Sequence, residues 1–163
     1  VNISAAQVLS GDFVDVVDTT LKSSGLPPDR LELELTESFF AQDAKQMNAV
    51  LAEVRARGVR IAVDDFGTGY STLSLLRHLP VDVIKIDRSF VADATAFNAT
   101  FIEAIRTIAR GLDLRLTAEG VETDEQHQML ARLGVDLVQG YLFARPMPEA
   151  APVTRATSPR VLR

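Results

Sequence analysis

The sequence predicts an α/β fold in which parallel strands alternate with helices. Short apolar runs, several rich in β-branched residues, alternate with segments whose hydrophobic residues recur at helical spacing. Glycines stand where these helices are expected to end, each a few residues before the next strand. A series of this kind forms a parallel sheet with right-handed crossovers. We expect one such domain over residues 1–148, followed by a disordered tail over 149–163.

The number of expected strands is smaller than a closed barrel requires. A (β/α)8 barrel has eight strands. The sheet is therefore either open or completed by two strands outside this chain. Six segments of the sequence are expected to be strands: 1–4, 31–36, 60–64, 83–87, 114–118 and 136–139.

Three segments between these strands place hydrophobic residues on one helical face. A later helix is expected to begin at Thr123, because Thr123-x-x-Gln126 has the pattern of a capping box. The three faces consist of Phe13, Val16, Val17 and Leu21; Met47, Val50, Leu51 and Val54; and Phe97, Phe101, Ile105 and Ile108.

Composition narrows the classes of function. A net charge of −5 argues against binding of nucleic acid polymers, and the absence of Cys excludes disulfides and thiolate metal sites. No apolar run approaches the roughly 18 residues that span a bilayer. We expect a cytoplasmic protein. The chain begins at Val1, so any targeting or membrane-anchoring segment of a longer parent would lie upstream.

Polar side chains recur at the carboxyl ends of the expected strands, always in the same phase of the strand alternation. The carboxyl ends of parallel strands meet at one edge, where active sites of (β/α) barrels lie. Solvent exposure of the loop that follows a strand explains a polar residue at one strand end. It explains poorly why six strands have a polar residue in the same phase of the alternation. The residues are Asn2, Glu34, Asp64, Lys85 with Asp87, Glu119 and Gln139.

The acids in this set favour magnesium or manganese. Glu34, Asp64, Asp65 and Glu119 offer hard oxygen ligands, and Asn2 adds a carbonyl oxygen. Four carboxylates cannot all stay ionised in one pocket without a cation. A pair of divalent ions would relieve the repulsion, and two-metal sites suit in-line hydrolysis of phosphodiesters.

Lys85 has two interpretations. It could orient a water molecule or bind phosphate, with Asp87 holding it in place. It could instead form a Schiff base, as in barrel aldolases, which borohydride trapping with a carbonyl substrate would reveal. The surrounding acids favour a charged ammonium and argue against the Schiff base.

Six blocks of the sequence together resemble the EAL-domain phosphodiesterases that hydrolyse cyclic di-GMP. They run in the family's order from Asn2 to about Pro148, and six blocks at compatible spacing are far more specific than one Gly-x-Gly turn. The blocks are NIS at 2–4, ELTES at 34–38, DDFGTGYS at 64–71, LPVDVIKIDRSFV at 79–91, AEGVET at 118–123 and QGYLFARPM at 139–147.

The resemblance implies an incomplete TIM-type barrel and a reaction in which metal-activated water opens cyclic di-GMP to linear pGpG. It implies two ions of Mg²⁺ or Mn²⁺. By motif matching, Asn2, Glu34 and Asp64 would bind one metal. Asp64 would bridge to a second metal, which Asp65 and Glu119 would also hold.

The remaining assignments follow from the same resemblance. Lys85 would contact the nucleophilic water, with Asp87 as its orienting partner, and Gln139 would hydrogen-bond near the water or the phosphate. Glu37 would brace the loop of residues 66–71, which in the family couples the metals to dimerisation. A homodimer and an upstream regulatory domain in the parent protein are therefore expected.

The sequence departs from the family at the motif for which the family is named. The Glu-Ala-Leu motif, whose Glu is a metal ligand, does not occur in this sequence, which starts at the family's Asn strand. A chain without that segment is expected to lose full activity, because one metal would be under-coordinated. It would also expose two sheet edges, for which dimerisation, altered packing or low stability would compensate.

A catalytically silent relative is the alternative. Such a module would bind cyclic di-GMP or a partner protein without hydrolysis. Degenerate relatives usually lose acids at the site positions, whereas every position that can be checked here is intact. The sequence therefore favours the enzyme for the parent protein.

Overall fold

The computed structural model describes residues 1–36, 44–68, 76–93 and 95–146. The described residues form five strands, and two pairs of neighbouring strands are hydrogen-bonded in parallel. The chain divides into two compact units. Unit 1 contains residues 1–85 and 112–114, and unit 2 contains residues 86–111 and those from 115 onward. The strands are β1 (Glu32–Thr36), β2 (Arg60–Phe66), β3 (Val83–Ile86), β4 (Arg115–Ala118) and β5 (Leu137–Val138).

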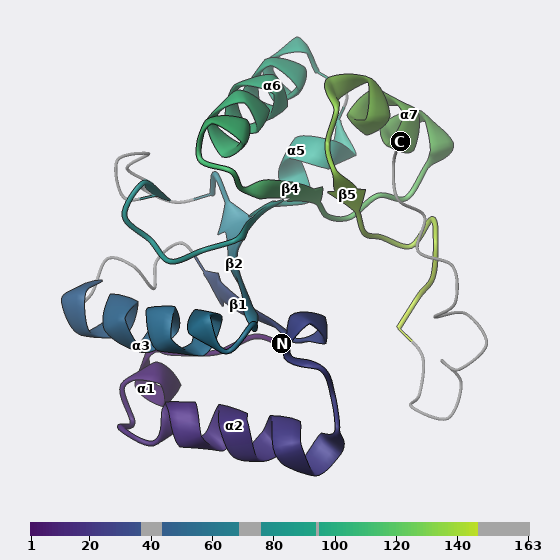
Figure 1. The fold of residues 1–163 in the computed structure, drawn as a ribbon. Helices are drawn as coiled ribbons and strands as arrows, with labels where there is room; N and C mark the ends of the chain where they lie inside the picture. Colours follow the sequence, from purple (N-terminus) through teal and green to yellow (C-terminus); the bar gives the residue numbers. More distant parts are fainter. Residues whose placement is uncertain (37–43, 69–75, 94, 147–163) are drawn as a thin grey trace. The chain divides into compact units, whose positions relative to one another are not determined.

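Helices alternate with the strands as the sequence predicts. In unit 1, α3 packs against α1, α2 and β2 (Figure 1). In unit 2, α6 packs against α5, α7 and β4. Unit 1 has α1 (Ala5–Val8), α2 (Phe13–Ser24), the 3₁₀ turn η1 (Pro28–Arg30) and α3 (Ala44–Ala56); unit 2 has α5 (Ser89–Ala92), α6 (Ala96–Gly111) and α7 (Asp124–Leu133).

The first expected strand, residues 1–4, is reduced to a single parallel bridge between Asn2 and Glu34. Glu34 N–H donates to the Val1 carbonyl at 2.9 Å, and the Glu34 carbonyl accepts from Ile3 at 3.0 Å. The pairing stops there because Ser4 begins α1 with a capping box, in which its side chain accepts from the Gln7 N–H. A helix start therefore replaces the second half of the strand.

Two residues on the predicted hydrophobic faces are exposed. Val16 is 52% exposed and Phe97 is 72% exposed, so the buried part of each helix is narrower than the hydrophobic spacing. The buried face of α2 consists of Phe13, Val17 and Leu21, which are four residues apart, and Val16 lies on its flank. The buried face of α6 is rotated away from Phe97 and is formed by Ile102, Ile105 and Ala109.

In each unit, an aspartate immediately before one strand clamps the strand that precedes it in the chain. In unit 1, Asp82 N–H donates to the Ile61 carbonyl at 2.8 Å, and Oδ2 of Asp82 accepts from Ile61 N–H at 3.0 Å. In unit 2, Asp136 N–H donates to the Leu116 carbonyl at 3.1 Å, and Oδ2 of Asp136 accepts from Leu116 N–H at 2.8 Å. Each carboxylate thus satisfies a backbone donor at the amino end of a buried strand.

Removal of the Asp136 carboxylate is expected to destabilise unit 2. Asp136→Ala leaves the N–H of the buried Leu116 without its acceptor, which costs roughly 1–2 kcal/mol of unfolding free energy. Asp136→Asn keeps a carbonyl oxygen at the same place and should lose less. Denaturant unfolding of the two variants measures the difference, and equal losses would rule out the clamp.

Candidate active site

Lys85 is the centre of the charged cluster in unit 1. It lies on β3, is 3% exposed, and contacts acids on two other strands. Its Nζ lies 2.9 Å from Oε1 of Glu34 on β1 and 3.1 Å from Oδ1 of Asp64 on β2. The structure thus brings together three of the predicted site residues. Lys85 is thus paired with two carboxylates, as its interpretation as a cation expects.

The strand register explains why the two acids meet. Glu34 pairs with Ala62 and Asp64 pairs with Thr36 across the parallel β1–β2 ladder. Glu34 and Asp64 therefore stand on a diagonal, with both side chains on the same face of the sheet. Alternation along the strands, the basis of the prediction, accounts for this placement. The bridge from Asn2 to Glu34 brings the backbone of Asn2 beside the same strand.

One oxygen of Asp64 is open to a further ligand. Oδ1 is buried and accepts no hydrogen bond in the described part of the chain. Its ion pair with Lys85 balances charge without supplying the directed bond that a buried oxygen usually has. A carboxylate oxygen with this remaining capacity, beside a second carboxylate, fits a hard divalent cation in donor type and charge.

The backbone turns sharply after Asp64. Asp65 has a φ of 53°, in the left-handed region that only glycine adopts freely. Thr68 closes the turn, with its N–H and its hydroxyl both donating to the Asp65 carbonyl. The turn takes the side chain of Asp65 out of the regular strand alternation.

Among the described residues, no three side chains of Asp, Glu, His or Cys come close enough together to hold a metal ion. The acids of unit 1 that do converge are Glu34 and Asp64, with Lys85 between them. The predicted ligand set of Asn2, Glu34, Asp64, Asp65 and Glu119 stays a prediction.

In unit 2, backbone hydrogen bonds position Glu119 and Gln139. Glu119 N–H donates to the Ile86 carbonyl at 3.1 Å, and Gln139 N–H donates to the Ala118 carbonyl at 2.9 Å. The Gln139 carbonyl then accepts from Val121 N–H at 3.1 Å. The residues that follow β4 and β5 are thus joined directly at the carboxyl ends of these strands, where the sequence predicts functional side chains.

Gly140 allows this close approach. A Cβ at position 140 would overlap the backbone nitrogen and carbonyl oxygen of Val121, which is fully buried. Gly120 is also required, because its φ of 68° is left-handed and a Cβ there would overlap the side chain of Arg88. The glycines of the AEGVET and QGYLFARPM blocks therefore have a steric role that fixes the backbone beside Glu119 and Gln139.

Asp87 interacts with its own turn. Its Oδ1 accepts from Ser89 N–H at 3.0 Å and from the Ser89 hydroxyl at 2.5 Å. Burial raises the pKa of Asp87, but the hydrogen bonds from Ser89, that from the Arg88 N–H and the charge of Arg88 outweigh it. The pKa is therefore below its usual value. Its role in orienting Lys85 stays a prediction.

Ser89→Ala is expected to raise the pKa of Asp87 toward its usual value. A lowered pKa means that the carboxylate stabilises the fold fully above its unfolded-state pKa and loses that contribution as the pH falls through its folded-state pKa. An NMR titration of the Asp87 carboxyl carbon measures the midpoint. Ser23→Ala, on the exposed face of α2, is the matched control. An unchanged midpoint in Ser89→Ala would contradict the assignment.

Glu37 lies outside the described residues, so its predicted bracing of the loop of residues 66–71 stays a prediction.

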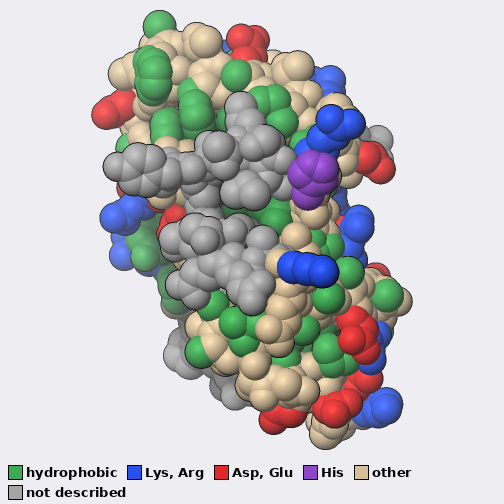
Figure 2. All heavy atoms as spheres, turned by 90° about the vertical axis from the view of Figure 1, so that its left-hand side faces the viewer, with side chains coloured by type: hydrophobic (Ala, Val, Ile, Leu, Met, Phe, Trp, Pro, Cys, Tyr) green, Lys and Arg blue, Asp and Glu red, His purple; other side chains and the backbone are tan. Residues whose placement is uncertain are grey.

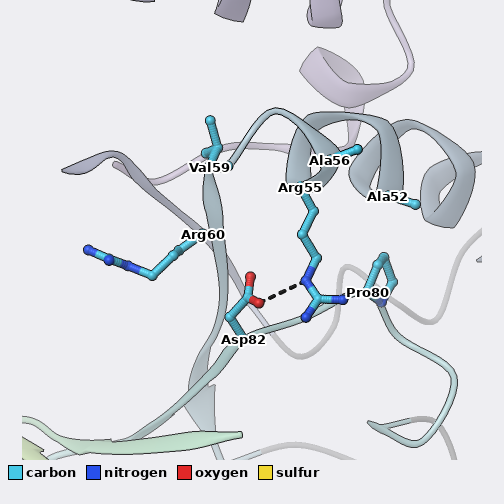
Figure 3. Close-up of a pocket in the computed structure, with 8 residues that line it drawn as sticks. Ala52, Arg55, Ala56, Val59, Arg60, Pro80 and Asp82 are labelled. Atoms are coloured by element: carbon cyan, nitrogen blue, oxygen red, sulfur yellow. Dashed lines mark hydrogen bonds and ion pairs between the residues drawn. The ribbon is translucent and has the colours of Figure 1, made fainter. Parts of the chain in front are cut away.

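A hollow of about 490 Å³ at the amino ends of β2 and β3 has the wrong chemistry for a second site. The acidic residue that lines the hollow, Asp82, already forms an ion pair with Arg55 at 2.7 Å and accepts a hydrogen bond from the Ile61 N–H. Arg60 points away from Asp82 and Arg55 (Figure 3). Amino-end positions of barrel strands generally serve stability. The hollow is therefore best explained as a structural feature.

The surface carries mixed charge. Figure 2 shows acidic and basic side chains interspersed with hydrophobic ones over one face. The described side chains on that face form no continuous basic stripe of the kind that tracks a nucleic acid backbone. Among the described residues, each helix is too short or too polar to cross a bilayer.

Comparison with known proteins identifies the family. The family model described as the EAL domain matches residues 1–146. A bifunctional diguanylate cyclase/cyclic di-GMP phosphodiesterase, MucR of Pseudomonas aeruginosa, is 43% identical over 150 residues, which are 91% of this chain and 22% of MucR. NbdA of the same organism, a cyclic di-GMP phosphodiesterase, is 43% identical over 153 residues, which are 93% of this chain and 20% of NbdA.

Solved structures give the same result. A cyclic di-GMP complex of the PaMucR phosphodiesterase has a TM-score of 0.84 at 42% identity and covers 91% of this chain and 61% of that one. A manganese and cyclic di-GMP complex of Klebsiella pneumoniae BlrP1 has a TM-score of 0.83 at 34% identity. The match covers 90% of this chain and 38% of the BlrP1 chain.

These matches confirm the predicted fold class, an incomplete TIM-type barrel. The chain spans about a quarter or less of the length of the curated relatives that it matches. The family model covers the blocks that carry the resemblance, except for the last residue of the sixth block, Met147. The chain belongs to the EAL domain family.

Proposed function

We propose that this EAL domain is the catalytic part of a metal-dependent phosphodiesterase that hydrolyses cyclic di-GMP to linear pGpG. The observation that carries the proposal is the convergence of Glu34 and Asp64 on Lys85 at the carboxyl ends of neighbouring strands. The relatives MucR and NbdA, which are named as cyclic di-GMP phosphodiesterases, support it. The manganese complex of BlrP1 supports the use of a divalent ion.

The residues of unit 1 would bind the divalent ions and orient the attacking water. Glu34 and Asp64 would hold one divalent ion, with Asn2 as a neutral oxygen ligand, and Asp64 with Asp65 would serve a second ion. When bound, Mg²⁺ or Mn²⁺ lowers the pKa of water and balances charge on the phosphate. Lys85 would donate a hydrogen bond to the attacking water and fix its direction.

The residues of unit 2 enter the proposal through their sequence blocks. Glu119 would be a ligand of the second ion, and Gln139 would donate to the phosphate or the water. Asp87 would orient Lys85, and Glu37 would brace the loop of residues 66–71. Homodimerisation, a cytoplasmic location and control by an upstream domain belong to the same proposal.

The test is hydrolysis of cyclic di-GMP by the protein that carries these residues, with Mn²⁺ or Mg²⁺. We expect pGpG to form, as followed by chromatography, and its formation to stop when EDTA removes the metal. Turnover that survives EDTA would contradict the metal requirement.

A binding module is the second candidate. It is favoured by one observation: the described residues contain no three-ligand acidic group, and an ammonium already lies between the two acids that converge. Such a module would bind cyclic di-GMP without pGpG formation. Tight binding measured by calorimetry, without product in the same solution, would decide in its favour.

A further inference from the structure

The ammonium of Lys85 lies between two carboxylates, Glu34 and Asp64, and contacts both. Its Nζ is within about 3 Å of one oxygen of Glu34 and one oxygen of Asp64, from strands on which it does not itself lie. The side chains of Lys85, Glu34 and Asp64 are mostly buried, at 4%, 20% and 13% exposure. Two buried carboxylates require a nearby positive charge, and here Lys85 supplies it.

A divalent ion would use the same oxygens. Mg²⁺ binds carboxylate oxygens at about 2.0–2.1 Å, so an ion on Oε1 of Glu34 and Oδ1 of Asp64 would lie close to Nζ. Positive charges this close in a poorly solvated site repel one another strongly. The Asp64 oxygen, which accepts no hydrogen bond in the described part of the chain, would gain a directed ligand from such an ion.

We infer that Lys85 is an internal competitor of the metal, whose ammonium neutralises Glu34 and Asp64 until a divalent ion displaces it from at least one of them. The inference rests on the proposed metal site. The metal-free site is stabilised by the protein's own cation, and metal affinity is lowered by the free energy needed to move it. Lys85 thereby sets the metal concentration at which the site fills.

Competition makes a prediction that a purely structural role does not. If Lys85 only supported the structure of the site, its loss would weaken Mn²⁺ binding. If Lys85 competes with the metal, its loss strengthens Mn²⁺ binding. Lys85→Met removes the charge and keeps most of the length of the side chain. We expect it to bind Mn²⁺ at least about tenfold more tightly than the unaltered protein, measured by electron paramagnetic resonance of free Mn²⁺. Lys45→Met, on the exposed surface of α3, is the control and should leave the affinity unchanged.

Each outcome of the Mn²⁺ binding experiment either supports or overturns the competition between Lys85 and the metal. Equal or weaker binding by Lys85→Met overturns the competition, and so does an absence of Mn²⁺ binding in both proteins. If Lys85→Met is unfolded without metal, Mn²⁺ must refold it, as followed by circular dichroism; failure to refold also overturns the competition. Tight Mn²⁺ binding by the unaltered chain, together with no cyclic di-GMP hydrolysis by a protein that also carries the Glu-Ala-Leu segment, counts against the proposed function and leaves the competition standing.

Discussion

Asp64→Asn is expected to abolish metal-dependent hydrolysis of cyclic di-GMP while leaving the domain folded. The proposed role of Asp64 is to bridge two ions, and an amide supplies neither the charge nor the second ligand oxygen. Loss of a bridging carboxylate should lower kcat at least about a hundredfold. Chromatographic detection of pGpG at saturating Mn²⁺ measures the effect.

The fold should tolerate this change because the cluster carries excess negative charge. Glu34 and Asp64 share one ammonium, so a neutral amide at position 64 leaves Lys85 fully paired with Glu34. The unfolding free energy of Asp64→Asn should equal or exceed that of the unaltered protein. Asp18→Asn, which weakens an ion pair with Arg57 on the surface of unit 1, is the matched control and should keep full activity. An active Asp64→Asn protein would remove Asp64 from the site.

Lys85→Met is expected to lower the unfolding free energy of the metal-free protein by roughly 3 kcal/mol, because it leaves two mostly buried carboxylates without their counter-charge. That is a large part of the total stability of a typical domain. Urea unfolding in the presence of EDTA measures the loss.

A second substitution tests the cause of that loss. In the Lys85→Met background, Glu34→Gln removes one of the two uncompensated charges and should recover part of the stability. In the unaltered background the same Glu34→Gln change should have a small effect, because Lys85 keeps Asp64 as its partner. Additive effects of the two substitutions would contradict an electrostatic origin.

Local patterns in the sequence identified the elements of the fold well. The capping box at Thr123 and the left-handed helix ends at Gly25 and Gly134 are present in the structure. These features depend on a few neighbouring residues, which is why the sequence predicts them. Hydrophobic periodicity was less reliable at single positions: Val16 and Phe97 fit the helical spacing but lie off the buried faces, which depend on what each helix packs against.

Two further features of the structure have local signals in the sequence. Ser4-x-x-Gln7 has the same spacing as the capping box at Thr123 and explains why the first strand is so short. The Val-Asp pairs that precede β3 and β5 are a repeated signal for the clamps made by Asp82 and Asp136.

The candidate site was predictable in its residue types but not in its pairing. Strand alternation placed Glu34, Asp64 and Lys85 in the same phase, and the structure brings all three into contact. The division of one ammonium between two acids depends on register and side-chain reach across three strands, which periodicity does not contain. Strand alternation also does not contain the left-handed turn at Asp65, which Thr68 closes through its hydrogen bonds to the Asp65 carbonyl.

The most direct test of the account is anomalous diffraction from crystals of the protein soaked with Mn²⁺. We expect a manganese peak within bonding distance of Glu34 and Asp64, with the ammonium of Lys85 withdrawn from at least one of these carboxylates. Ordered crystals that show Lys85 still bridging both acids, with manganese absent or bound elsewhere, would contradict it.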